Sequence, residues 1–144
     1  MKKTALLIAV LAMTFACKDK GATAANTGYD ALMDKTLAIH DEVMEDMMPL
    51  GNLSSTLAKK VDSFPDNKQY RQALDKLEHA HDFMMEWMQD FGKKFPYEER
   101  QGNKESQLDI KQRHDLLKQE YEEVRTMQDS VNASMENARQ VLGS

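Results

Sequence analysis

Methionine and histidine are the side chains of this 144-residue chain whose chemistry best suits a bound ligand. Six of the eleven methionines lie in two short runs, at residues 44–48 and 84–88. Thioether sulfur and imidazole nitrogen are ligands that suit Cu(I). A soft-metal site is therefore one hypothesis for this sequence. Its candidate ligands are Met44, Met47, Met84, Met85, Met88 and His114, and Met48 and Trp87 are expected at the same level.

Two other uses of these methionines compete with metal binding. Methionine adapts to irregular gaps in a core, and core filling is the interpretation that the pattern favours. A methionine-rich groove for a partner helix or an unfolded chain is the other alternative. His40 and His81 occupy apolar stripes far apart from each other, so we expect hydrogen-bonded or boundary histidines there.

Enzymatic motifs are absent from the sequence. It contains no H-E-x-x-H, no P-loop, no glycine-rich dinucleotide turn and no G-x-S-x-G. Glu78, His79 and Glu120 do not supply the ligand set of a di-iron bundle. The sequence therefore predicts a protein that is not an enzyme.

The elements that would position these side chains are helices. Three stretches place residues of an apolar stripe at alternating spacings of four and three, which is the pattern of helices packed as in a coiled coil. Strand patterns are nearly absent. The three stripes are Tyr29, Met33, Thr36, His40, Val43, Met47, Leu50, Ser54, Leu57, Val61 and Phe64; Tyr70, Leu74, Leu77, His81, Met84, Met88, Phe91 and Phe95; and Ile110, His114, Leu117, Tyr121, Val124, Gln128, Val131, Met135, Ala138 and Leu142.

Proline and polar residues mark the helix ends. Pro65 and Pro96 stop the first two helices, because a residue before proline avoids the helical region. We expect Asp66 or Asn67 to cap the second helix, Ser106 to cap the third, and Gly143 to end it. Short connections favour antiparallel neighbours. The predicted fold is an all-α, antiparallel up-down-up three-helix bundle with coiled-coil-like heptads.

Pro49 interrupts the first stretch and removes one backbone hydrogen bond. Because the stripe keeps its register there, we expect a kinked but continuous helix; two helices with a tight break are the alternative. Symmetric turns would set Met47 near Met88, Met48 near Met85, and His114 level with Trp87. The same matching sets His40 near Phe95, and His81 near Ser54 and Tyr121.

Residues 1–16 read as a lipoprotein signal peptide. Lys2 and Lys3 precede an apolar run, 5–15, that is too short to span a bilayer. Ala16 then precedes Cys17, the only cysteine of the chain, which we expect to be lipidated. Residues 17–28 would form the acylated cysteine and a flexible tether, and residues 29–144 the helical domain.

Charge and sorting signals bound the partners. Without Lys2 and Lys3, 17 basic side chains face 24 acidic ones, a formal net charge of −7, which argues against nucleic acid. Lys18 stands where an inner-membrane retention signal would have aspartate. We therefore expect a protein attached by lipid on Cys17 to the bacterial outer membrane, facing the periplasm or the surface, with a protein partner on a helical face.

Three segments also carry a resemblance to a family. Residues 16–18 (ACK), 38–44 (AIHDEVM) and 80–88 (AHDFMMEWM) resemble small helical lipoproteins of Bacteroidetes that bear the label "viral A-type inclusion protein". The resemblance covers most of the chain and implies no activity. The predicted function is that of a non-enzymatic envelope lipoprotein and helical interaction or binding module. A periplasmic copper-binding protein and a periplasmic holdase chaperone are the alternatives.

Overall fold

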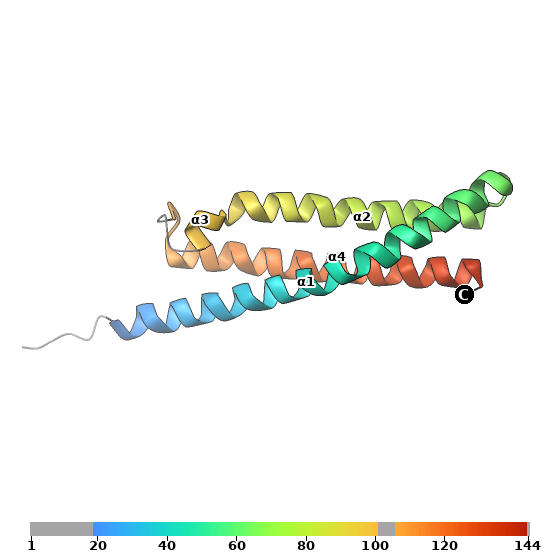
Figure 1. The fold of residues 1–144 in the computed structure, drawn as a ribbon. Coiled ribbons are helices and arrows are strands. Elements are labelled where there is room, and N and C mark those ends of the chain that lie inside the picture. Colours follow the sequence, from blue (N-terminus) through green and yellow to red (C-terminus); the bar gives the residue numbers. More distant parts are fainter. Residues whose placement is uncertain (1–18, 101–105, 144) are drawn as a thin grey trace, which may run out of the picture.

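The computed structural model describes residues 19–100 and 106–143, and their regular structure is entirely helical. The all-α prediction is therefore confirmed. Figure 1 shows α1, α2 and α4 lying along one another as long rods, with the short α3 at the end where α2 leads into α4. The helices are α1 (Asp19–Ser63), α2 (Lys68–Lys94), α3 (Tyr97–Arg100) and α4 (Ile110–Leu142).

The long α1 passes through Pro49 without interruption. The alternative of two helices with a break at this residue is thus wrong. The fourth helix of the structure is instead the short α3, which follows Pro96. α1 also begins at Asp19, well before Tyr29, so helix extends into the segment that we expected to be a tether.

Side-chain caps fix the starts of α2 and α4. Asn67 caps α2, as predicted, and its Oδ1 accepts hydrogen bonds from the backbone N–H groups of residues 69 and 70. The prediction of Ser106 as the cap of α4 is wrong, because Asp109 and Gln112 form a reciprocal capping box there. The left-handed Gly143 (φ 73°) ends α4, as predicted.

The core side of α1 follows the predicted stripe. Its buried members are spaced by four and three residues up to Thr36 and by seven residues from there on. The hydroxyl of Thr36 donates to the carbonyl oxygen of Leu32 at 2.8 Å. Phe64, at the end of the stripe, is exposed. The buried residues of α1 are Tyr29, Met33, Thr36, Val43, Leu50 and Leu57.

The buried faces of α2 and α4 are each displaced by one residue from half of the predicted stripe. All three long helices contact one another, so the buried side of each faces two neighbours. On α2, Ala73, Ala80 and Trp87 are buried in place of Leu74, His81 and Met88. On α4, Glu120, Met127 and Ser134 are buried, whereas Tyr121 and Gln128 are only half-buried. The predicted members that are buried are Leu77, Met84, Phe91, Phe95, Leu117, Val124, Val131, Met135 and Ala138.

The core also contains a carboxylate, that of Glu120, which the predicted stripe did not include. Glu120 is 1 % exposed, and its Oε1 accepts a hydrogen bond from Lys94 Nζ at 2.7 Å. This bond raises the pKa of Lys94 above its ordinary 10.5, against the opposing effect of burial. The pair joins the last turn of α2 to α4, and a buried charge needs such a partner.

Candidate functional site

Exposed methionines gather on the two helices that carry the methionine runs. Met44 and Met48 of α1 are 47 % and 77 % exposed, and Met85 and Met88 of α2 are 40 % and 38 % exposed. Met84 is fully buried, so only this member of the α2 run fills the core in the way that the favoured interpretation expects. We call Met44, Met47, Met48, Met85 and Met88 the methionine seam.

Two contacts locate the seam between α1 and α2. At one end, the rings of His40 and Trp87 lie 5.6 Å apart between centroids. At the other end, Ser54 and His81 line one cleft, as the sequence predicted for this pair. The seam methionines of α1 and Met85 of α2 lie between these two points along the chain, and Met88 lies one residue beyond Trp87, so they come to similar levels of the bundle.

The two contacts compare differently with the predicted register of α1 and α2. Ser54 and His81 share a cleft, as predicted, whereas His40 lies against Trp87 and not near Phe95. Between these two contacts, Met44 comes level with the stretch of α2 that contains Met85 and Met88.

The prediction that His114 comes level with Trp87 is wrong. Lys94 contacts Glu120 and Lys76 contacts Asn137, so numbers rise along α4 as they fall along α2. These contacts separate His114 from Trp87 by about 20 Å along the bundle, at a rise of 1.5 Å per residue. His114 therefore lies apart from the seam methionines that were expected to share a metal with it.

The His40 end of the seam opens into a cleft of about 290 Å³. His40 Nδ1 lies 3.1 Å from Asp41 Oδ1 at the surface. His40 Nε2 and Trp87 Nε1 are both buried, and neither has a hydrogen-bond partner among the described residues. Trp87 is 3 % exposed and stacks on Phe91, with ring centroids 4.8 Å apart. The lining residues are Leu37, His40, Trp87, Met88, Phe91, Gly92 and Arg100.

The seam lies in an acidic part of the sequence. Residues 36–58 of α1 contain four carboxylates and no lysine or arginine, and the same holds for residues 77–92 of α2. The nearest guanidinium in the cleft is that of Arg100 in α3, which lies 5.8 Å from the Phe91 ring centroid. Apolar thioethers within a negative field favour a ligand that is both soft or apolar and positively charged.

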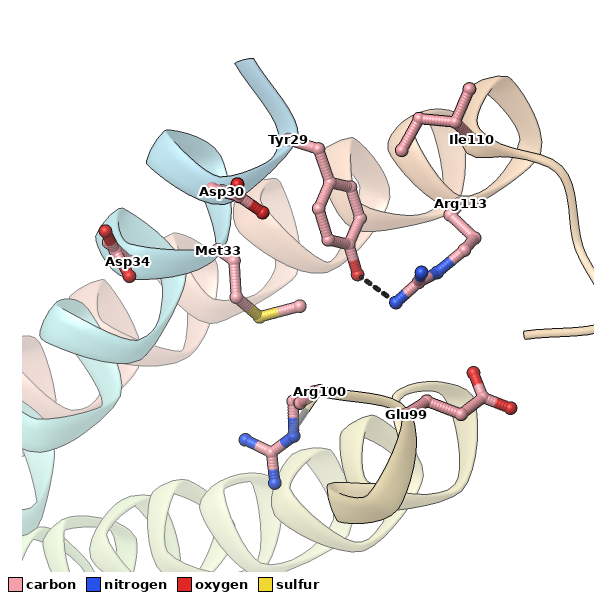
Figure 2. Close-up of a pocket in the computed structure, with 8 residues that line it drawn as sticks. All are labelled: Tyr29, Asp30, Met33, Asp34, Glu99, Arg100, Ile110 and Arg113. Carbon is pink, nitrogen blue, oxygen red and sulfur yellow. Dashed lines mark hydrogen bonds between the residues drawn. The ribbon is translucent and has the colours of Figure 1, made fainter. Parts of the chain in front are cut away.

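A second cleft, of about 380 Å³, lies where α1, α3 and α4 meet. Figure 2 shows Tyr29 and Arg113 pointing toward each other across it, while the carboxylate of Glu99 points away. Arg113 donates to the Tyr29 hydroxyl at 3.0 Å, and burial raises the pKa of this phenol above 10.0 despite the nearby guanidinium. The hydrogen bond between Arg113 and Tyr29 therefore links α4 to α1 across this cleft. Its lining residues are Tyr29, Asp30, Met33, Asp34, Glu99, Arg100, Ile110 and Arg113.

The structure bears on metal ligands and membrane-spanning helices only within the residues that it describes. Among the side chains it describes, no three histidines, cysteines or carboxylates are grouped as metal ligands. No helix in the described ranges is long and apolar enough to cross a bilayer. Residues 1–16 and Cys17, with its predicted lipid, lie outside the described residues.

Comparison with known proteins identifies no relative. The chain matches no protein-family model, no curated protein and no solved structure.

Sequence reasoning found the methionines and His40 but missed Trp87 as a core residue and the Lys94–Glu120 pair. The signal for Trp87 was available in the row Ala73, Ala80 and Trp87, which keeps a seven-residue spacing.

Proposed function

We propose that this chain is a non-enzymatic envelope lipoprotein whose helical domain binds a partner protein along the methionine seam. The observation that carries the proposal is the exposure of Met44, Met48, Met85 and Met88 at matching levels of α1 and α2. Methionine side chains are unbranched and polarizable, so a surface of them adapts to an apolar partner without a fixed complementary shape.

The partner that fits this surface is a basic amphipathic helix. The seam lies on α1 and α2 with a cleft near each end, and the apolar face of a third helix would lie along it. Residues 36–58 and 77–92 carry eight carboxylates and no lysine or arginine, so lysines or arginines flanking the apolar face of the partner would be attracted. An acidic or unpatterned partner lacks one of these two features.

For the domain itself we propose an antiparallel up-down-up bundle of the three long helices, with α1 bent at Pro49. Two contacts between α1 and α4 support the direction of these helices: Arg113 with Tyr29, and Gln128 with Glu42, in which residue numbers rise together. The missing N–H of a proline inside a helix supports the bend. This arrangement leaves one side of α1 and α2 available along the seam.

The proposed address follows from the amino-terminal sequence. Cleavage before Cys17 and acylation of this residue would attach the domain to the outer membrane, as in the lipoproteins of Bacteroidetes that the chain resembles. Mass spectrometry of the membrane-extracted protein should find residues 1–16 removed and acyl chains on Cys17. The Cys17→Ser variant should then leave the membrane fraction. An unmodified cysteine or an uncut leader would contradict this address.

The partner proposal is tested with designed peptides. A fluorescent basic amphipathic helical peptide should bind the protein in a fluorescence anisotropy titration, and a scrambled peptide of the same composition should bind at least tenfold more weakly. The Met44→Gln/Met85→Gln double variant should lose binding by a similar factor, because it replaces thioether contacts with amides of similar size.

The matched control is Leu108→Gln, which changes an exposed apolar side chain away from the seam. It should bind the peptide as the unmodified protein does. Equal binding of the scrambled peptide would mean that charge alone attracts it. Unchanged binding to the double variant would place the contact elsewhere, and either result overturns the proposal.

A further inference from the structure

The ring of His40 has one nitrogen bound and one free among the described residues. A carboxylate only accepts hydrogen bonds, so the 3.1 Å contact with Asp41 Oδ1 places a proton on His40 Nδ1. In the neutral ring, Nε2 then carries a lone pair. Asp41 is exposed at the surface, and Nε2, on the far side of the ring, is buried. The lone pair therefore faces inward.

This is the arrangement in which protein histidines bind metals. A carboxylate commonly holds one ring nitrogen of a ligating histidine, which fixes its tautomer and raises the basicity of the other nitrogen. In most such sites the free nitrogen faces the metal. Asp41 and His40 provide this pairing from adjacent residues of α1.

One side chain that lines the cleft with His40 is a soft ligand. It is Met88 of α2, which presents a thioether. Trp87 Nε1 is a donor only, so it cannot serve as a ligand, but its ring lies 5.6 Å from that of His40. A cation near an indole face gains electrostatic stabilisation.

We propose that this cleft binds one Cu(I) ion through His40 Nε2 and the sulfur atom of Met88. Thioether and imidazole ligands select Cu(I) over harder ions. The carboxylates of residues 36–58 and 77–92 attract a cation to the seam, and the guanidinium of Arg100, which lines the same cleft, makes an ion of low charge the better fit. The site differs from the one expected from sequence, because His40 takes the place of His114.

The copper proposal goes beyond the proposed peptide binding. Its failure would leave the peptide-binding proposal intact. Trp87 is the only tryptophan of the chain, so its emission reports on the cleft. The protein is titrated anaerobically with Cu(I) in ascorbate against a chromophoric Cu(I) chelator, and separately with Ag(I), a soft monovalent ion that does not change oxidation state. We expect one equivalent to bind and to quench the emission of Trp87.

Matched variants assign the ligands. His40→Gln and Met88→Leu should each weaken binding at least tenfold and remove the quenching. His79→Gln and Met48→Leu, which change an exposed histidine and an exposed methionine outside the cleft, should change neither. The circular dichroism of each variant checks its folding.

X-ray absorption of the unmodified Cu(I)-loaded protein is independent of any variant. It should show a mixed shell of nitrogen and sulfur neighbours. Binding no tighter than that of the His40→Gln/Met88→Leu double variant would overturn the proposal. So would equal losses in Met48→Leu, since they indicate unspecific thioether binding, or a shell without nitrogen.

Discussion

Replacing Lys94 with methionine tests whether the ion pair with Glu120 is a requirement of the core. Lys94→Met keeps an unbranched side chain but removes the cation from Glu120, whose Oε1 now loses its 2.7 Å hydrogen bond. The carboxylate is 1 % exposed and cannot reach water without opening the contact between α2 and α4. It must then remain charged without a partner or take up a proton.

The size of the effect follows from the burial of the two partners. Removing one member of a buried ion pair destabilises a protein by about 3–5 kcal/mol. Lys94 is 36 % exposed, and water screens its share of the interaction. We therefore expect Lys94→Met to lower the free energy of unfolding by about 2–3 kcal/mol. For a domain of this size that is a fall in Tm of about 8–12 °C.

The opposite replacement should behave differently. In Glu120→Leu the buried carboxylate is gone, and Lys94, which already reaches solvent, is left hydrated. The free energy of unfolding should then change by less than about 1 kcal/mol in either direction, because an apolar side chain of similar size suits the site. Lys94→Met/Glu120→Leu should recover most of the stability that Lys94→Met loses.

Urea unfolding at pH 7, followed by far-ultraviolet circular dichroism, measures all three variants. If Glu120→Leu is destabilised as much as Lys94→Met, attraction within the pair outweighs the desolvation of the carboxylate, and our reasoning is refuted. A loss below about 0.5 kcal/mol in Lys94→Met, the size of an ordinary surface substitution, would refute the burial of Glu120.

At alkaline pH, the pKa of Lys94 determines how the free energy of unfolding changes with pH. The folded pKa of Lys94 is raised above 10.5 by Glu120, so the folded state holds this proton more tightly than the unfolded chain does. The resulting stability is fully present below pH 10.5 and is lost as the pH rises through the folded pKa. The difference between the unmodified protein and Lys94→Met should therefore shrink in that range.

Four further substitutions test other parts of the fold. Tyr29→Phe leaves the Arg113 donor without its acceptor and should lower the free energy of unfolding by about 1.5–3 kcal/mol in urea. The difference between the absorbance titrations of the unmodified protein and this variant at 295 nm should isolate a phenol with a pKa above 10.0. The unfolded chain releases this proton at a lower pH than the folded protein does, so stability falls as the pH rises past 10.0. Ala80→Leu should overfill a fully buried position and lower the free energy of unfolding, measured by thermal unfolding, by about 1–3 kcal/mol. His81→Leu on the exposed side should change this free energy by less than about 0.5 kcal/mol. A larger loss in His81→Leu than in Ala80→Leu would mean that the predicted stripe, with His81 inside, is correct. Pro49→Ala should raise the free energy of unfolding by about 1–3 kcal/mol, since it returns a backbone hydrogen bond at an exposed position, and a loss would mean that packing needs the proline.

Helices and their ends were predictable because their causes are local. A proline acts on its own backbone and on that of the preceding residue, so the end of α1 before Pro65 could be read directly. Asn67 and Gly143 likewise act on groups within a few residues. Ser106 failed because Asp109 offers the same chemistry nearby, together with Gln112 for a capping box.

The inward faces of α2 and α4 were decided by tertiary packing. Leu74, His81 and Met88 keep the same seven-residue spacing as the row that contains Ala80 and Trp87, and hydrophobicity favours neither row clearly. Two neighbouring helices select the alanine row, since small side chains let backbones approach.

Local patterns in the sequence were enough to predict long helices, the ends of α1 and α4, and the methionines and acidic residues that share two helical segments. Only the tertiary structure decided the register, because α3 lies beside the first turns of α4 and so displaces α4 along α2. That displacement removes His114 from the seam and pairs Lys94 with Glu120. The packing of α1 on α2 leaves His40 facing Trp87. Such pairings depend on distances between segments far apart in the chain, which no local pattern encodes.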